Sequence, residues 1–106
     1  MECKLLIGDL CIPTDEDGFI QEPELWSEAV ARELARTEGI DAMSEDHWRV
    51  VNFLREYWLR FGVAPLVRKL LRETGFDLRR VYALFPSGPA KGACKIAGLP
   101  KPVGCV

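Results

Sequence analysis

The sequence of 106 residues has a single histidine, His47, and no C-x-x-C pair among its four cysteines. Zinc sites are usually built from closely spaced cysteine and histidine pairs, so the ligand spacing argues against a zinc site. No run of 18 or more apolar residues is present, which argues against a membrane-spanning helix. Internal repeats and low-complexity tracts are also missing, and the length fits one domain.

The first residues, MECKLLIGDLCIP, lack the basic start and the long apolar stretch of a secretory signal, because Asp9 interrupts the apolar run. We therefore expect a cytoplasmic protein. Cysteines are seldom oxidised in that compartment, so Cys3, Cys11, Cys94 and Cys105 are not expected to form structural disulfides. Cys3 and Cys11 flank a predicted turn and are interpreted as small apolar strand residues without an assigned role.

Acidic residues are missing from the last part of the chain. Residues 1–46 carry 13 acids and 3 bases, whereas residues 47–106 carry 11 bases and 3 acids. After Leu78 there is no acid and there are five bases, namely Arg79, Arg80, Lys91, Lys95 and Lys101. This asymmetry fits an ordinary dipolar domain with solvated faces. It fits equally a basic C-terminal surface that binds an anion or an acidic partner.

Hydrophobic periodicity predicts a mostly α-helical domain that begins with a small β-hairpin over about residues 1–20. Five helices are predicted over about residues 23–97: Pro23–Thr37, Glu45–Phe61, Pro65 to before Gly75, Leu78–Phe85 and Pro89–Gly98. Ser44 can cap the second of them. Residues 1–98 are expected to form the domain. Residues 99–106 are expected to form a mobile C-terminal arm, because Pro100 and Pro102 prevent a helix.

The penultimate residue of the chain is Cys105, and a second cysteine, Cys94, lies eleven positions before it. The segment from Gly98 to Cys105 would span about 25 Å if extended, at about 3.3 Å per residue, which is enough to enter another protein. Folded back, it would bring the two thiols together, an arrangement typical of reversible sulfur or redox chemistry. The neighbouring bases that could lower a thiol pKa or dock a partner are Lys91, Lys95 and Lys101. Spacing alone favours the plainer interpretation of one stray terminal cysteine and one buried helical cysteine.

The second and third predicted helices, joined at Gly62, resemble the first helices of a winged helix-turn-helix. The later helix carries Arg68, Lys69 and Arg72, and such a helix can lie in the DNA major groove. Two packed amphipathic helices give the same pattern, so a DNA-binding regulator is kept as an alternative. His47, in the first turn of its helix, is interpreted as a capping or packing residue.

The C-terminal motif LFPSGPAKGACKIAGLPKPVGCV closely resembles the C-terminus of the DsrC/TusE family. Further matches occur upstream in the same order: DEDGF, Trp26, EGI, HW, FLREYW and GVAPLVRKL. The resemblance covers essentially the whole chain from about Asp15. It implies a small helical fold with an N-terminal hairpin, a helix-turn-helix-like core and a mobile C-terminal arm.

The resemblance also implies a role for each cysteine of the arm region. Cys105 would carry sulfur, and Cys94 would be the second sulfur ligand. Family members that act with dissimilatory sulfite reductase have both cysteines, whereas members devoted to tRNA thiolation typically keep only the penultimate one. The chain therefore resembles the DsrC branch, in which sulfur derived from sulfite bridges the two cysteines as a trisulfide. This implies a sulfurtransferase-type covalent carrier rather than an independent enzyme.

The partners are implied by the same resemblance. The arm would enter the siroheme site of dissimilatory sulfite reductase, and a membrane redox complex would reduce the trisulfide. In sulfur oxidisers, small sulfurtransferases would load the carrier. No cofactor or metal is expected in this chain, and siroheme and iron–sulfur clusters are expected in the partner. The alternative within the family is a TusE-like sulfur relay for tRNA thiolation.

Overall fold

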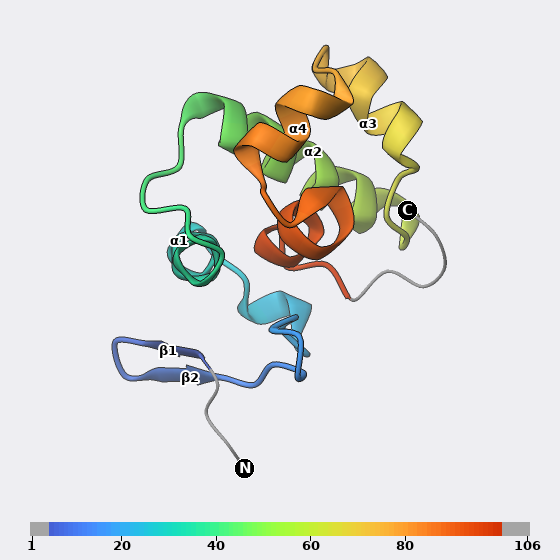
Figure 1. The fold of residues 1–106 in the computed structure, drawn as a ribbon. Coiled ribbons are helices and arrows are strands. Elements are labelled where there is room, and N and C mark those ends of the chain that lie inside the picture. The colour runs from blue at the N-terminus through green and yellow to red at the C-terminus, as the bar shows by residue number, and fades with distance from the viewer. Residues whose placement is uncertain (1–4, 101–106) are drawn as a thin grey trace.

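The computed structural model describes residues 5–100, in which a short hairpin precedes a set of helices (Figure 1). Strands β1 (Leu5–Ile7) and β2 (Leu10–Ile12) pair antiparallel, with Leu6 opposite Cys11. The tight turn between them uses Gly8, whose φ of 58° lies in the left-handed region that glycine adopts without strain. The predicted N-terminal hairpin is confirmed.

Six helical segments follow in the described part of the chain. They are the 3-10 helix η1 (Pro23–Leu25), the α-helices α1 (Glu28–Thr37), α2 (Glu45–Phe61), α3 (Val67–Thr74) and α4 (Leu78–Leu84), and the π-helix η2 (Pro89–Cys94). The mostly α-helical class is therefore confirmed. No helix within residues 5–100 is long and apolar enough to cross a membrane.

Two of the predicted helix boundaries are wrong. The helix predicted over Pro23–Thr37 is broken, because Ser27 adopts an extended conformation and its hydroxyl accepts a bond from the Val30 N–H. This is an N-cap, so a new helix begins there. The third helix begins at Val67 rather than Pro65, because Leu66 remains extended with a ψ of 149°.

The disulfide expectation is wrong at Cys11, which is disulfide-bonded. Cys94 is the other cysteine within residues 5–100, and it is a free thiol. The argument from cell compartment concerns the usual state of cysteines and could not detect an individual bond. Cys3 lies outside the described residues.

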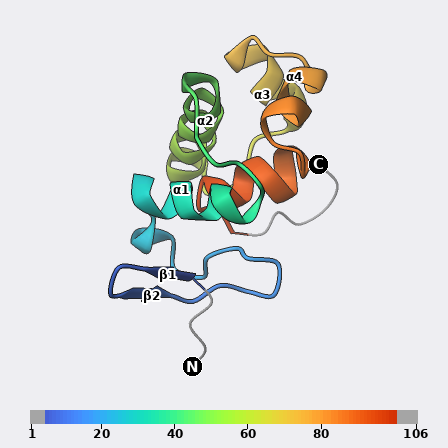
Figure 2. The same ribbon diagram turned by 60° about the vertical axis from the view of Figure 1, so that its left-hand side comes forward.

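One hydrophobic core joins the hairpin to the helices. Figure 2 shows α1 and the final helical segment lying between the hairpin and the α3–α4 pair. Helix α1 packs on β1, while α2 packs on both α3 and η2. The fully buried side chains of the core include Phe19, Leu34, Val50, Leu54, Phe85, Ile96 and Leu99. The core therefore includes the last described segment of the chain.

Candidate functional site

The final helical segment begins at a glycine-dependent turn. Gly88 has a φ of 91°, and a Cβ at this position would lie 3.1 Å from the Tyr82 ring. Pro89 then opens η2, which is a π-helix through Cys94. Single π-helical turns are rare and occur often at functional sites. The predicted fifth helix is thus present, with a wider first part than sequence periodicity could indicate.

Cys94 lies in the core at the end of η2. Its exposed fraction is 3%, and burial raises the pKa of its thiol to about 12. The thiolate is the nucleophilic form of cysteine. Burial therefore shields the Cys94 thiol from solvent and disfavours its thiolate form.

The chain beyond Cys94 ends its helix in a Schellman motif. The Leu99 N–H donates to the Cys94 carbonyl at 3.1 Å, and the Gly98 N–H donates to the Lys95 carbonyl at 3.0 Å. Gly98 has the left-handed φ of 75° that this motif requires. Leu99 is fully buried, whereas Pro100 is exposed. The first residue of the predicted arm is thus packed against the body and hydrogen-bonded to the backbone of Cys94.

Lys95, one of the predicted thiolate-tuning residues, forms a buried ion pair. Its Nζ lies 2.6 Å from Glu38 Oε2, and both side chains are 11% exposed. Burial by itself would raise the pKa of Glu38. The hydrogen bond from Lys95, then a hydrogen bond from Ser87 and the charge of Lys95, together outweigh burial and lower that pKa below 4.5. Lys95 therefore neutralises a carboxylate at the end of α1 and fixes the final helix to it.

The other predicted site residues have separate placements. Lys91 is exposed on η2. Cys105 and Lys101 lie outside the described residues, so the assignment of Cys105 as the sulfur-bearing thiol stays a prediction. Burial is the only cause of the Cys94 pKa shift within residues 5–100. Tuning of that thiol by Lys91 or Lys101 also stays a prediction.

Two residues that sequence reasoning did not select hold the end of the final helix. The Trp26 indole N–H donates to the Ile96 carbonyl at 2.8 Å. Arg55 donates through Nη1 to the carbonyls of Ala97 and Gly98, and its guanidinium carbon lies 4.7 Å from the centroid of the Trp26 ring. In the sequence, the one signal for Trp26 is its place among the residues that match the family pattern. For Arg55, the sequence signal is the FLREYW motif, which contains this residue and matches the family pattern.

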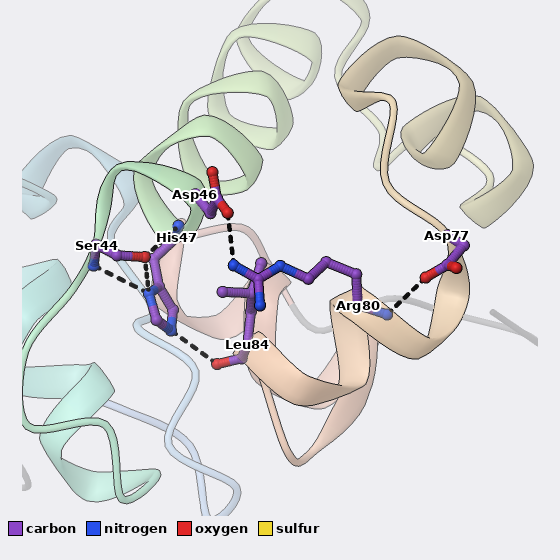
Figure 3. A network of polar contacts seen from close by, with 6 residues as sticks. All are labelled: Ser44, Asp46, His47, Asp77, Arg80 and Leu84. Carbon is purple, nitrogen blue, oxygen red and sulfur yellow. Dashed lines mark hydrogen bonds and ion pairs between the residues drawn. The ribbon is translucent and has the colours of Figure 1, made fainter.

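His47 links α2 to α4 (Figure 3). Its Nδ1 accepts from the Ser44 backbone N–H at 3.0 Å, and its Nε2 lies 2.9 Å from the Leu84 carbonyl. A carbonyl only accepts, so Nε2 carries the proton and the neutral ring satisfies both bonds. The ring also packs edge-on against Phe85. The interpretation of His47 as a capping and packing residue is confirmed.

The predicted basic helix, α3, presents its charges to solvent. Arg68 and Arg72 are exposed and Lys69 is half-buried. Just before α3, the end of α2 and the following loop expose four large apolar side chains: Leu59, Phe61, Val63 and Leu66. A surface that mixes arginine with exposed apolar groups is suited to a protein partner. Binding of DNA by α3 stays a prediction.

No metal centre is formed within residues 5–100, where no group of three or more histidine, cysteine, aspartate or glutamate side chains could hold an ion. A pocket of about 270 Å³ lies between the loop at residues 14–18 and the end of α1, with Glu38 and Lys95 in its wall.

Comparison with known proteins gives a family match over nearly the whole chain. The family model described as "DsrC like protein" matches residues 7–106. The gamma subunit of the dissimilatory-type sulfite reductase of Nitratidesulfovibrio vulgaris is 51% identical over 92 residues, covering 87% of this chain and 88% of that protein. The sulfurtransferase TusE of Salmonella typhimurium is 47% identical over 102 residues, covering 90% and 93% respectively.

Solved structures agree with this match. The oxidised gamma subunit of dissimilatory sulfite reductase, DsrC, from Archaeoglobus fulgidus has a TM-score of 0.89 and 43% identity, covering 96% of this chain and 98% of that one. DsrC of Pyrobaculum aerophilum has a TM-score of 0.79 and 55% identity, covering 93% and 90%. The hairpin, the helical body and the final helix therefore form a known fold.

Proposed function

Because the chain belongs to the DsrC-like protein family, we propose that it is a sulfur-carrier protein that serves as a cosubstrate of dissimilatory sulfite reductase. Cys105 accepts the sulfur, and Cys94 is the second sulfur ligand. The chain works as a covalent carrier and is not an independent enzyme. It holds no cofactor of its own, and the siroheme and iron–sulfur clusters belong to the reductase.

One observation carries this proposal. The family motif includes both cysteines, and Cys94 lies at the end of the last helix, where its backbone is hydrogen-bonded to the start of the arm. The eight residues from Gly98 to Cys105 reach about 25 Å when extended, at about 3.3 Å per residue. The same segment, folded back, can return Cys105 to Cys94. The Cys105 thiol can thus enter a partner protein while the Cys94 thiol stays buried in the core.

The proposed reaction balances in sulfur, oxygen and electrons. Sulfite sulfur gains four electrons as it becomes the central atom of a trisulfide between Cys105 and Cys94. Two of these electrons come from the thiols and two from the reductase. The three oxygens leave as three water molecules, with protons taken from the two thiols and from solvent. Reduction of the trisulfide by four electrons and four protons then releases hydrogen sulfide and restores both thiols.

The partners follow from this reaction. The sulfite reductase loads the carrier, and a membrane-bound redox complex supplies the four electrons that release sulfide. Where sulfur flows in the oxidative direction, small sulfurtransferases load the carrier instead. The exposed apolar residues at the end of α2 and the arginines of α3 offer a docking surface to such proteins. We place the protein in the cytoplasm, where these thiols stay reduced between cycles.

A TusE-like relay for tRNA thiolation is the second candidate, favoured by relatives named TusE at 45–47% identity. In a relay, Cys105 alone carries a persulfide from a donor to an acceptor. Cys94 would then be dispensable for transfer. The retention of Cys94 in the arm motif favours the sulfite reductase role.

Single-cysteine variants test the proposal. Each variant is incubated with sulfite, a reductant and an active dissimilatory sulfite reductase, and sulfur on each cysteine peptide is measured by mass. Cys105→Ala is expected to load no sulfur while its thermal unfolding stays close to wild type. Cys94→Ala is expected to carry sulfur on Cys105 without an internal bridge. Loading of the Cys105→Ala variant would contradict the assignment, and full turnover by Cys94→Ala would favour the TusE-like relay.

A further inference from the structure

The final helix ends with carbonyls that its own backbone cannot satisfy. The Ile96 carbonyl would normally accept from the residue four positions later, but this residue is Pro100, which has no N–H. The last carbonyls of a helix need side chains, water or a capping motif. The Trp26 indole supplies the missing donor to Ile96 at 2.8 Å from a position 70 residues earlier in the chain.

Arg55 completes the cover over this helix end. Its Nη1 lies 3.3 Å from the Ala97 carbonyl and 3.4 Å from the Gly98 carbonyl, while its Nη2 donates to the Pro23 carbonyl at 2.8 Å. Pro23 belongs to η1, immediately before Trp26. Arg55 therefore joins three separate segments: the entry to α1, the middle of α2 and the start of the arm. We call this last segment, residues 96–99, the arm root.

The positive charge of Arg55 has no acidic partner within residues 5–100. Its neighbours are carbonyl oxygens and two aromatic rings, with the guanidinium carbon 4.7 Å from the Trp26 centroid and 5.7 Å from the Trp58 centroid. A cation at a helix C-terminus is favoured by the helix dipole, and stacking on tryptophan adds to this. The planar fork of arginine suits several carbonyls at once, which lysine cannot reproduce.

The packing at Gly98 is the tightest point of this contact. A Cβ built at Gly98 would overlap the Trp26 ring and lie 3.0 Å from Arg55 Nη1. The left-handed φ of Gly98 also disfavours any other residue. The helix end is thus held by close contact as well as by hydrogen bonds.

We propose that Trp26 and Arg55 are positioning residues that keep Cys94 buried and unreactive until the arm root is released. The link is the Schellman motif, in which Leu99 bonds to the Cys94 carbonyl and Gly98 bonds to the next one. Exposing Cys94 requires this motif to open, and it cannot open while Trp26 and Arg55 hold Ile96 to Gly98. This inference deepens the proposed function, because it assigns control of the second sulfur ligand to two residues outside the arm.

The test measures access to Cys94 without any sulfur partner. Reduced full-length protein is treated with iodoacetamide, and alkylation of the Cys94 peptide alone is followed by mass at increasing urea. Arg55→Met, which removes the fork but keeps a long apolar side chain, is expected to raise the alkylation rate without urea by at least about tenfold. Arg55→Lys should give an intermediate rate, because charge is restored without the planar fork.

Trp26→Phe provides a milder second variant, because it removes the indole N–H and keeps an aromatic ring for Arg55. It is expected to raise the alkylation rate by about tenfold, since one bond to a buried carbonyl is lost. The matched control is Val81→Ala, which removes buried methyl groups from α4 and lowers global stability.

The comparison is made at urea concentrations that give all variants the same free energy of unfolding. If the inference holds, Cys94 in the Arg55 and Trp26 variants is still alkylated faster than in Val81→Ala, and the rate is insensitive to low urea. Equal rates at equal global stability would overturn it, because Cys94 would then be reached only by whole-domain unfolding. Failure of sulfur loading would leave this result unaffected, so the two proposals fail separately.

Discussion

The ion pair between Lys95 and Glu38 gives the most quantitative prediction, because the chain contains a matched exposed pair. Both pairs have an N···O distance of 2.6 Å. The Lys95–Glu38 side chains are 11% exposed, whereas those of Arg80 and Asp46 are 48% and 39% exposed. The two pairs therefore differ mainly in burial, which decides what the loss of one partner costs.

Replacing Lys95 with Met leaves the Glu38 carboxylate buried without its cation. Breaking a buried pair typically costs about 3–5 kcal/mol, and we expect about 3 kcal/mol because Glu38 borders a pocket. At about 4–8 °C per kcal/mol, Tm should fall by roughly 15 °C. Arg80→Ala breaks the exposed pair and should cost less than about 1 kcal/mol. Urea and thermal unfolding of both variants, under reducing conditions, give the two values.

The pH dependence supplies an independent check. The pKa of Glu38 is lowered in the folded protein, so its stabilisation is present above the ordinary value of 4.5 and is lost as pH falls through the folded pKa. Burial without Lys95 raises the Glu38 pKa in the variant, so the difference in stability between wild type and Lys95→Met should begin to shrink above pH 4.5 and should shrink further as the pH falls. A loss under about 1 kcal/mol for Lys95→Met at neutral pH, equal to that of Arg80→Ala, would refute the argument from burial.

Three further predictions concern the described site. The folded wild-type protein has a Cys94 pKa of about 12, whereas the thiol of the unfolded chain ionises at lower pH, so wild type should lose stability above about pH 9. Cys94→Ala should reduce this loss. Stability measured from pH 7 to 11 that declines equally in wild type and Cys94→Ala would count against this. His47→Ala should lower stability by about 1–2 kcal/mol in urea unfolding, since a helix cap and a bond to α4 are lost together, and His47→Gln should recover part of it. Gly98→Ala should lower the free energy of unfolding by more than about 2 kcal/mol, because Gly98 has a positive φ and an added Cβ would overlap the Trp26 ring. An unchanged urea midpoint would show that the helix end accommodates the methyl group.

Local sequence signals predicted the parts of the fold that depend on neighbouring residues. Ser44 followed by acidic residues marked the start of α2, and Gly62 marked its end, as the structure confirms. Pro23 correctly marks the start of a helix, but this helix is the short η1. The sequence therefore did not reveal the break at Ser27, where α1 begins. Two short elements in succession look like one longer helix when only spacing is read.

The contacts that shape the site could not be read from spacing. Lys95 and Glu38 are 57 residues apart, and Arg55 lies more than 40 residues before the carbonyls that it holds. From the sequence, Lys95 lies near the thiol and is expected either to tune the thiolate or to dock a partner. The structure instead pairs it with a carboxylate, and burial raises the Cys94 pKa. Only the three-dimensional packing distinguishes a free cation from a paired one.

The central claim is that sulfur becomes bonded to both cysteines of the arm region. The most direct measurement is the peptide mass of the wild-type protein after incubation with sulfite, a reductant and the candidate sulfite reductase, followed by alkylation of free thiols. We expect a cross-linked pair of peptides that contains Cys94, Cys105 and one additional sulfur atom. Two singly alkylated peptides without added sulfur, in the presence of an active reductase, would contradict it.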